Sequence, residues 1–345
     1  MPINSEKELI EQKLVVAGLV KCRLDASLFE FGGNERLKMI FDLEAHLAFL
    51  GEALRCQTPK LFTEYAVWTH QLLLTSGGDP EKFKNCLLQI DAQILESGSG
   101  TWVAMARHYL GEAISQLDSK PPLMESYIAE DNPHGALARD FLNGCLALKR
   151  DQAMALIANA VKDGVSVYDI YLNVITPAMY ELGRFWHLNR ITVAHEHYCT
   201  AVAQMVMAQL FPSIFDGSTK KGRLVATCVA GELHEIGARM VSDLFEMNGW
   251  DTVFLGADVP TETVIDTLVE LDAHALAVSV TLASHLGSLS EIIAAVRANP
   301  ACARVRILVG GAACNIDSSL WRRLGADGWA QDGASAITLA EQWKR

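Results

Sequence analysis

RLVATCVAGELHEIGARMV, residues 223–241, passes from a continuous apolar run into a short polar loop and then into a helical pattern. Three further β-rich runs follow, separated by helical stretches: DTVFLG (251–256), ALAVSV (275–280) and VRILVGG (305–311). Continuous apolar strands that alternate with helices are typical of a parallel sheet covered on both faces. Residues 222–345 are therefore predicted to form a doubly wound, flavodoxin-like α/β domain, which binds ligands at the carboxyl ends of its strands.

The chain before this domain has a helical pattern. Apolar residues recur at spacings of three and four up to about residue 118, and one predicted helix face collects Ile40, Leu43, Leu47, Leu50 and Leu54. A segment rich in proline and acidic residues follows, and helical patterns then resume. We expect a multi-domain α plus α/β protein with an N-terminal helical domain (1–118), a linker (119–134), a four-helix-bundle cap (135–214) and the α/β domain (222–345).

Composition excludes several classes of protein. Half of the 345 residues are hydrophobic, no apolar run approaches the length of a membrane span, and the start lacks a signal-peptide pattern, so a cytoplasmic protein is predicted. The eight cysteines form no CxxC pair, which argues against a disulfide framework. The net charge is −12, and residues 1–135 hold 12 basic against 19 acidic residues, so direct nucleic-acid binding is not expected.

Candidate ligand-binding residues follow three of the predicted strands. His234 lies in the loop after the first strand, Ser279 and Thr281 end the third, and Gly310 and Gly311 follow the fourth. A histidine in such a loop is either a ligand or simply exposed, and taken alone His234 leaves both interpretations open. The first turn lacks the GxGxxG pattern of a phosphate site.

Together these residues resemble the cobalamin-binding domain family. The family pattern of Asp-x-His-x-x-Gly, Ser-x-Thr and Gly-Gly stands here as Glu232, His234 and Gly237, then Ser279 and Thr281, then Gly310 and Gly311. The resemblance implies that His234 is the lower axial cobalt ligand, and that the cofactor's displaced tail enters a pocket lined by Ser279, Thr281 and the two glycines. Gly237 is expected to let the following helix pack closely. Glu232 replaces the aspartate that orients the ligand histidine, which leaves that geometry open.

The stretch GRFWHLNRITVAHEHY, residues 183–198, carries a second resemblance. Trp186, His187, Glu196 and His197 stand in the order found in the light-sensing cap of CarH-type adenosylcobalamin photoreceptors. That resemblance implies that Trp186, Glu196 and His197 form a lid over the adenosyl group, and that His187 replaces the lost carbon ligand after light breaks the cobalt–carbon bond. In the purely structural alternative, Trp186 belongs to the core of a helix and the Glu196–His197 pair is exposed to solvent.

The acidic N-terminal helical domain is similar in general pattern to that of photocobilins, cobalamin photoreceptors that also bind biliverdin. A linear tetrapyrrole needs an aromatic cleft with polar partners. The side chains of the right type are Tyr65, Trp68, His70, Trp102, His108 and Tyr109. The simplest alternative is that Tyr65 and Trp68, three residues apart, are core residues.

These resemblances lead to one predicted function and two alternatives. The main prediction is a light sensor that binds adenosylcobalamin and biliverdin and is not an enzyme. On illumination it would change its homo-oligomeric state or its partner contacts, and it would signal to another protein. The first alternative is a corrinoid methyl carrier that serves a separate methyltransferase and needs the upper face of its corrin open to methyl donors. The second is a subunit of a cobalamin-dependent mutase.

Overall fold

The computed structural model describes residues 33–98, 100–119, 124–214 and 221–343. The chain divides into two compact units. The first takes the chain to Pro122 together with Leu282–Gly287, and the second takes the remainder. Among the described residues, no helix is long and apolar enough to cross a membrane.

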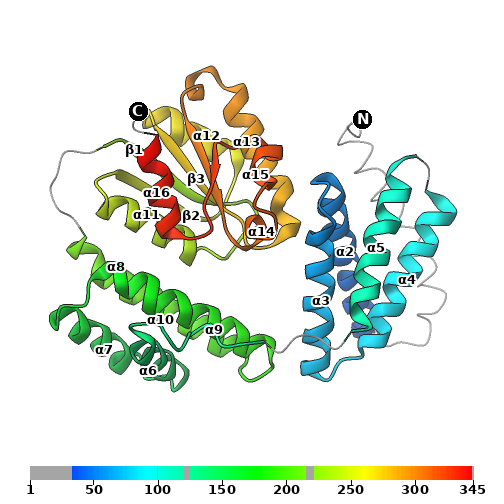
Figure 1. The fold of residues 1–345 in the computed structure, drawn as a ribbon, viewed down its shortest axis with the longest axis horizontal. Helices are drawn as coiled ribbons and strands as arrows, with labels where there is room; N and C mark the ends of the chain where they lie inside the picture. The colour runs from blue at the N-terminus through cyan, green and yellow to red at the C-terminus, as the bar shows by residue number, and fades with distance from the viewer. Residues whose placement is uncertain (1–32, 99, 120–123, 215–220, 344–345) are drawn as a thin grey trace. The chain divides into compact units, whose positions relative to one another are not determined.

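The first unit is helical, and its main elements are α2 (Gly33–Arg55), α3 (Pro59–Ser76), α4 (Pro80–Ser97) and α5 (Trp102–Leu117) (Figure 1). Proline at the first position starts α3 and α4, where its missing N–H costs nothing. Asp79 caps α4 by accepting from the backbone N–H groups of Glu81 and Lys82. As the sequence predicts, Leu43, Leu47, Leu50 and Leu54 are buried.

The second unit begins with a helical cap. Its helices are α6 (Gly135–Leu146), α7 (Arg150–Lys162), α8 (Val167–Asp169), α9 (Thr176–His187) and α10 (Val193–Leu210), with a π-helix, η2 (Ile170–Ile175), between α8 and α9 and a 3-10 turn, η3 (Phe211–Ser213), after α10. Their apolar core also contains Met240 and Leu244 of the following α/β domain. The cap therefore completes its core against that domain.

The α/β domain holds a five-stranded sheet whose strands pair in parallel in the order β2-β1-β3-β4-β5. The strands are β1 (Arg223–Val229), β2 (Asp251–Val259), β3 (Ala275–Ser279), β4 (Arg306–Gly310) and β5 (Gly328–Trp329). This order is that of flavodoxin-like folds, so the predicted doubly wound sheet is confirmed.

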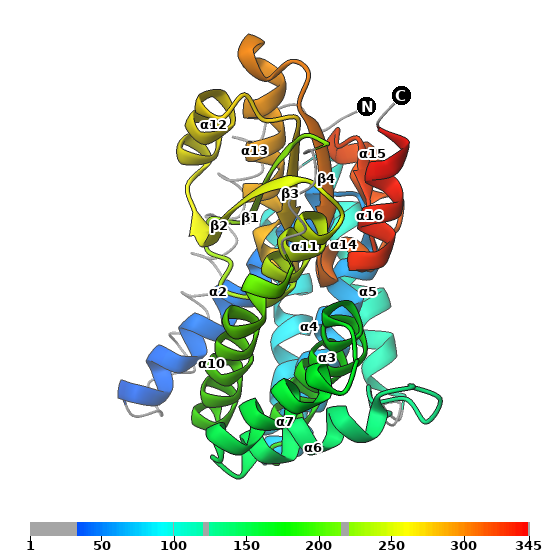
Figure 2. The same ribbon diagram turned by 90° about the vertical axis from the view of Figure 1, so that its left-hand side faces the viewer.

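Helices cover both faces of this sheet. Their bounds are α11 (Ile236–Met247), α12 (Thr261–Glu270), α13 (Leu286–Ala298), α14 (Ala312–Asn315), α15 (Leu320–Leu324) and α16 (Gly333–Gln342), with 3-10 turns η4 (Ala283–His285) and η5 (Pro300–Cys302). Phe245 of α11 and Ala336 and Ala340 of α16 share one core with the strands, so these helices cover the same face. Figure 2 shows α12 and α13 on the opposite face.

Candidate functional site

A buried carboxylate organises the loop between β1 and α11. Glu232 is fully buried, and its Oε1 atom lies 2.5 Å from Nδ1 of His234 and accepts the backbone N–H of His234 at 3.1 Å. Its Oε2 atom accepts the backbone N–H of Thr281 at 2.8 Å. Because a carboxylate only accepts hydrogen bonds, the hydrogen of a neutral His234 ring is on Nδ1. The sequence left open whether a glutamate could replace the family aspartate here. Glu232 does reach the imidazole of His234 and orients it.

The same loop presents an imidazole to its surroundings. The side chain of His234 is 58% exposed, and among the described residues its Nε2 atom has no hydrogen-bond partner. Leu233 beside it is 73% exposed, which is unusual for a large apolar side chain. The hydrogen bond to Glu232 raises the pKa of His234 against the effect of burial, and the charges of Glu232 and Glu196 raise it further.

The loop is also tied to the end of β2. Gly231, at φ +83°, donates its N–H to Oδ1 of Asp258 at 2.7 Å, and Asp258 donates its own N–H to the carbonyl of Glu232 at 3.0 Å. These bonds fix the backbone on the N-terminal side of His234. Asp258 therefore holds the backbone that precedes His234, and Glu232 holds its imidazole ring.

The ends of β3 and β4 meet beside this loop. Val280 donates its N–H to the carbonyl of Gly310, and Thr281 is bonded to Glu232. Gly311 has φ +94°, and a Cβ atom there would collide with the backbone of Val280. Gly311 is thus explained by the close approach of two strand ends, whereas a Cβ atom on Gly310 would lie 3.2 Å from the carbonyl oxygen of Ala330. The predicted pocket for the cofactor's tail stays a prediction.

The expected role of Gly237 in helix packing is wrong. Gly237 is exposed in the first turn of α11, and a Cβ atom there would meet nothing within 4 Å in the described chain. Among the described elements, none approaches closely enough to require a glycine at this position.

The predicted lid residues have unequal environments. Trp186 is half-buried near the end of α9, whereas His187 is only 2% exposed. On α10, Glu196 accepts from Thr200 Oγ1 at 3.0 Å and lies 3.5 Å from Nε2 of the exposed His197. Gln204, eight residues after Glu196 on α10, donates to Glu235, the residue after His234, which places α10 near the His234 loop.

Sequence reasoning missed two contacts between the cap and α11. Gln204 on α10 donates from Nε2 to Oε1 of Glu235 at 2.6 Å, and the hydroxyl of Tyr171 donates to Oδ2 of Asp243 at 2.7 Å. The spacing of Glu196, Thr200 and Gln204, four residues each, was a usable signal for a polar stripe on one helix face.

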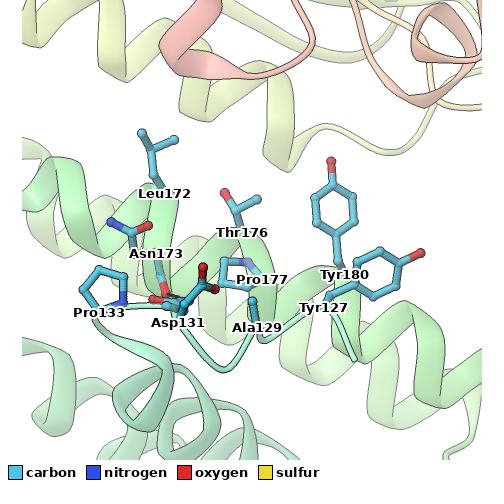
Figure 3. Close-up of a pocket in the computed structure, with 10 residues that line it drawn as sticks. Tyr127, Ala129, Asp131, Pro133, Leu172, Asn173, Thr176, Pro177 and Tyr180 are labelled. Carbon is cyan, nitrogen blue, oxygen red and sulfur yellow. Dashed lines mark hydrogen bonds between the residues drawn. The ribbon is translucent and has the colours of Figure 1, made fainter. Parts of the chain in front are cut away.

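A second face of the cap is hollowed between the segment 127–133 and the η2–α9 region (Figure 3). The cavity has a volume of about 440 Å³. Asn132 lines the cavity and donates from its side chain to the carbonyl of Asn173. In a regular helix the N–H of residue 177 would bond this carbonyl, but Pro177 has no N–H. Leu172, Thr176 and Tyr180 project to one side in Figure 3. Leu172 also lies 3.7 Å from the position of a Cβ on Gly333, so the hollow adjoins the start of α16.

The six residues predicted for biliverdin do not converge. Trp102 and Tyr109 are buried in the core of the first unit, while Trp68 is exposed and His108 is exposed beside Glu112. His70 is half-buried. Tyr65 stacks on Phe49 and bonds His46, whose Nδ1 atom lies 2.5 Å from its hydroxyl. Tyr65, Trp102 and Tyr109 thus pack against other residues of the first unit, and a biliverdin cleft stays a prediction.

Comparison with known proteins identifies the kind of site. Two family patterns, each described as a B12 binding domain, match residues 137–211 and 222–338. Dimethylamine corrinoid protein 2 of Methanosarcina mazei is 24% identical over 212 residues, which span 60% of this chain and 96% of that protein. A corrinoid protein of Desulfitobacterium hafniense is 23% identical over 197 residues, 56% of this chain and 90% of that protein.

The solved monomethylamine corrinoid protein of Methanosarcina barkeri has a TM-score of 0.55 and 19% identity, over 61% of this chain and 99% of that chain. At this identity the likeness shows a shared fold. Together with the family matches, it indicates a protein with B12-binding domains and a cobalamin or other corrinoid as its cofactor.

These relatives correct the functional prediction. They are corrinoid proteins, two of them named for methylamines, so the light-sensing interpretation is wrong. The adenosyl lid formed by Trp186, Glu196 and His197, and His187 as a replacement cobalt ligand, depended on photolysis and are withdrawn with it. The buried position of His187 agrees with this correction. The comparisons support neither biliverdin, a light-dependent homo-oligomer nor a downstream signalling partner.

Proposed function

We propose that the chain is a corrinoid-carrying protein of a methyltransferase system. In this role it would bind the cofactor through His234 and pass between separate catalytic partners without being a catalyst itself. The observation that carries the proposal is the arrangement of His234 and Glu232, an oriented, outward-facing imidazole at the carboxyl edge of a B12-binding sheet. The relatives named as methylamine corrinoid proteins support the choice of a methyl carrier.

The residues present suit a corrinoid. Within the described part of the chain, no group of three or more His, Cys, Asp or Glu side chains is placed to hold a metal ion. A bare ion needs several protein ligands, whereas a metal already held by a macrocycle needs one axial donor. His234 supplies one neutral imidazole nitrogen, and the exposed Leu233 beside it supplies apolar surface that a macrocycle would cover.

Each residue of the loop then has a task. Glu232 keeps the hydrogen on Nδ1, so Nε2 is the nitrogen available to the cobalt, and the hydrogen bond makes that nitrogen a stronger donor. The backbone N–H of Thr281 holds the second carboxylate oxygen, which stops Glu232 from rotating away. When bound, the corrinoid supplies a cobalt centre that accepts a methyl group from one partner and releases it to another.

The cap would face the side of the corrin where methyl groups arrive. Glu196 and Thr200, bonded to each other, give a polar surface to α10, the helix whose Gln204 bonds Glu235 beside His234. We propose that these two residues and the half-buried Trp186 border the upper face. Ser279, Thr281, Gly310 and Gly311 remain the proposed lining of the pocket for the cofactor's tail.

The proposal is tested by loading and unloading methyl groups on the purified protein. The chain is reconstituted with hydroxocobalamin, freed of unbound cofactor, reduced, and treated with ¹⁴C-methyl iodide and then with a thiol. We expect one corrinoid per chain, protein-associated label, and transfer of that label to the thiol. Binding of cobalamin without uptake of label by the corrinoid would contradict the carrier role and leave the corrinoid site intact. His234→Ala is the matched variant and should lose the bound cofactor.

A further inference from the structure

The cap is attached to the α/β domain by two polar contacts to the same helix. Gln204 on α10 bonds Glu235, which immediately precedes α11, and Tyr171 in η2 bonds Asp243 within α11. Glu235 and Asp243 are eight residues apart, or about 12 Å along a helix. Two bonds at this separation fix both the position and the rotation of the cap on α11.

The Tyr171–Asp243 contact is the buried one of the pair. The side chain of Tyr171 is fully buried and Asp243 nearly so. Burial raises the pKa of both groups. The π-helix that carries Tyr171 is stabilised by Thr176, whose hydroxyl donates to the Tyr171 carbonyl at 2.9 Å. Single π-helical turns of this kind are rare and occur frequently at functional sites. This contact anchors the cap at a distance from the His234 loop.

The Gln204–Glu235 contact lies next to the ligand histidine instead. Glu235 directly follows His234 in the chain, and its second oxygen lies 3.5 Å from the position of a Cβ on Gly256 in β2. Gln204 ends the stripe of α10 that begins with Glu196 and Thr200. Its bond to Glu235 is only partly buried, so it can open at less cost than the Tyr171–Asp243 bond.

We propose that Gln204 is a positioning residue for His234. By holding Glu235, it completes a restraint that Glu232 and Asp258 provide on the other side of His234. The placement of the imidazole therefore depends on whether α10 is docked, while Tyr171–Asp243 keeps the cap attached when the Gln204 bond opens. The role in cofactor binding rests on the proposed corrinoid function, whereas the mechanical link can be measured without cofactor.

The test is amide hydrogen exchange of residues 231–236 in the unloaded full-length chain. Gln204→Glu places two carboxylates together and should speed exchange in this loop by roughly fivefold, the effect of one lost side-chain hydrogen bond. The double variant Gln204→Glu with Glu235→Gln restores the bond with donor and acceptor reversed and should return exchange to near the wild-type rate. Tyr171→Phe is the matched control and should leave exchange in this loop unchanged.

A second readout uses the protein loaded with hydroxocobalamin at one fixed pH. After reduction to cob(II)alamin in protein with ¹⁵N-labelled histidines, the electron paramagnetic resonance spectrum reports the fraction of cobalt with His234 bound, which Gln204→Glu should lower and the double variant should restore. Unchanged exchange and an unchanged spectrum in Gln204→Glu would overturn the proposal. Faster exchange with no cobalamin bound by the wild type would contradict the corrinoid function while supporting the mechanical link. If Gln204→Glu does not fold, Gln204→Leu provides the same comparison without added charge.

Discussion

Oε1 of Glu232 lies 2.5 Å from Nδ1 of His234, and the other oxygen of the same carboxylate is held by the N–H of Thr281. Both oxygens accept from N–H groups, so the site requires two acceptors. The longer side chain of glutamate therefore does the work that the resemblance assigns to aspartate. The loop after β1 is linked through this one side chain to the end of β3.

Glu232→Gln should weaken cobalamin binding. A glutamine has one acceptor oxygen, so its NH₂ group would face either His234 Nδ1–H or Thr281 N–H, both of which are donors. We expect a loss of about 10- to 100-fold in affinity, the usual effect of removing the group that orients a metal-ligating histidine. Titration of the apoprotein with hydroxocobalamin measures it. Glu262→Gln on the exposed surface of α12 is the control, and equal affinities for the two variants would contradict the role of Glu232.

Cobalamin affinity should rise with pH. Glu232 raises the pKa of His234 in the unloaded chain, and a protonated imidazole has no lone pair for cobalt. Binding should therefore weaken as pH falls through that raised pKa. The stability of the apoprotein should respond in the opposite sense. The stabilisation from protonated His234 is complete below the ordinary pKa of 6.5 and is lost as pH rises through the folded-state value.

Binding curves and urea unfolding curves between pH 5.5 and 8.5 measure the two effects. His234→Gln keeps a polar side chain and does not titrate, so the pH dependence of the free energy of unfolding should diminish in this variant. A wild-type affinity that is flat over this range would contradict proton competition at His234.

Substitution by alanine should change the stability of the protein differently at Gly311 and at Gly237. Gly311→Ala places a Cβ against the backbone of Val280 at a positive φ, so we expect destabilisation by about 2 kcal/mol or more. Gly237→Ala adds a methyl group that meets nothing within 4 Å, in the first turn of a helix. It should be neutral or stabilise the apoprotein by about 0.5 kcal/mol. Thermal unfolding of the two variants, side by side, checks the assignment.

His46 should make the first unit sensitive to acid. Burial lowers the pKa of His46 to about 4, so the folded state favours the neutral ring over the protonated one. Its contribution to stability is complete above pH 6.5 and is lost as pH falls toward 4, by about 3 kcal/mol in total. His46→Gln can still bond Tyr65 and does not titrate. Its free energy of unfolding should fall less than that of the wild type between pH 7 and pH 4, and parallel curves would show that His46 titrates normally.

The sheet and the ligand loop were predictable because their signals are local. Four strands are continuous apolar runs, and His234 and Glu232 lie within three residues of each other. The fifth strand, Gly328–Trp329, has only two residues and produces no such run. The π-helix at Ile170–Ile175 was not predicted either, because its apolar spacing differs little from that of the α-helices beside it.

The contacts that place the cap were not predictable from local pattern. Gln204 and Glu235 are 31 residues apart, and Tyr171 and Asp243 are 72 apart. Such pairs depend on how the helices pack on α11. The segment 119–134, interpreted as a linker, shows the same limit. Its described part is held by Glu181, which accepts the N–H of Tyr127 at 2.9 Å and is paired with Arg184.

The function was mispredicted because the cap motif was given too specific a meaning. Trp186, His187, Glu196 and His197 are present, but the relatives are corrinoid proteins, two of them named for methylamines. A tryptophan near a corrin does not determine which group the cobalt carries.

The most direct test of the corrinoid site is the electron paramagnetic resonance spectrum of the chain loaded with cob(II)alamin, with all histidines labelled with ¹⁵N. If Nε2 of His234 binds cobalt, the three-line nitrogen splitting of the unlabelled protein becomes two-line in the labelled protein, and His234→Ala loses the two-line pattern. A three-line splitting that persists in the labelled protein would show that the cofactor's own base occupies the axial position, and would contradict the account.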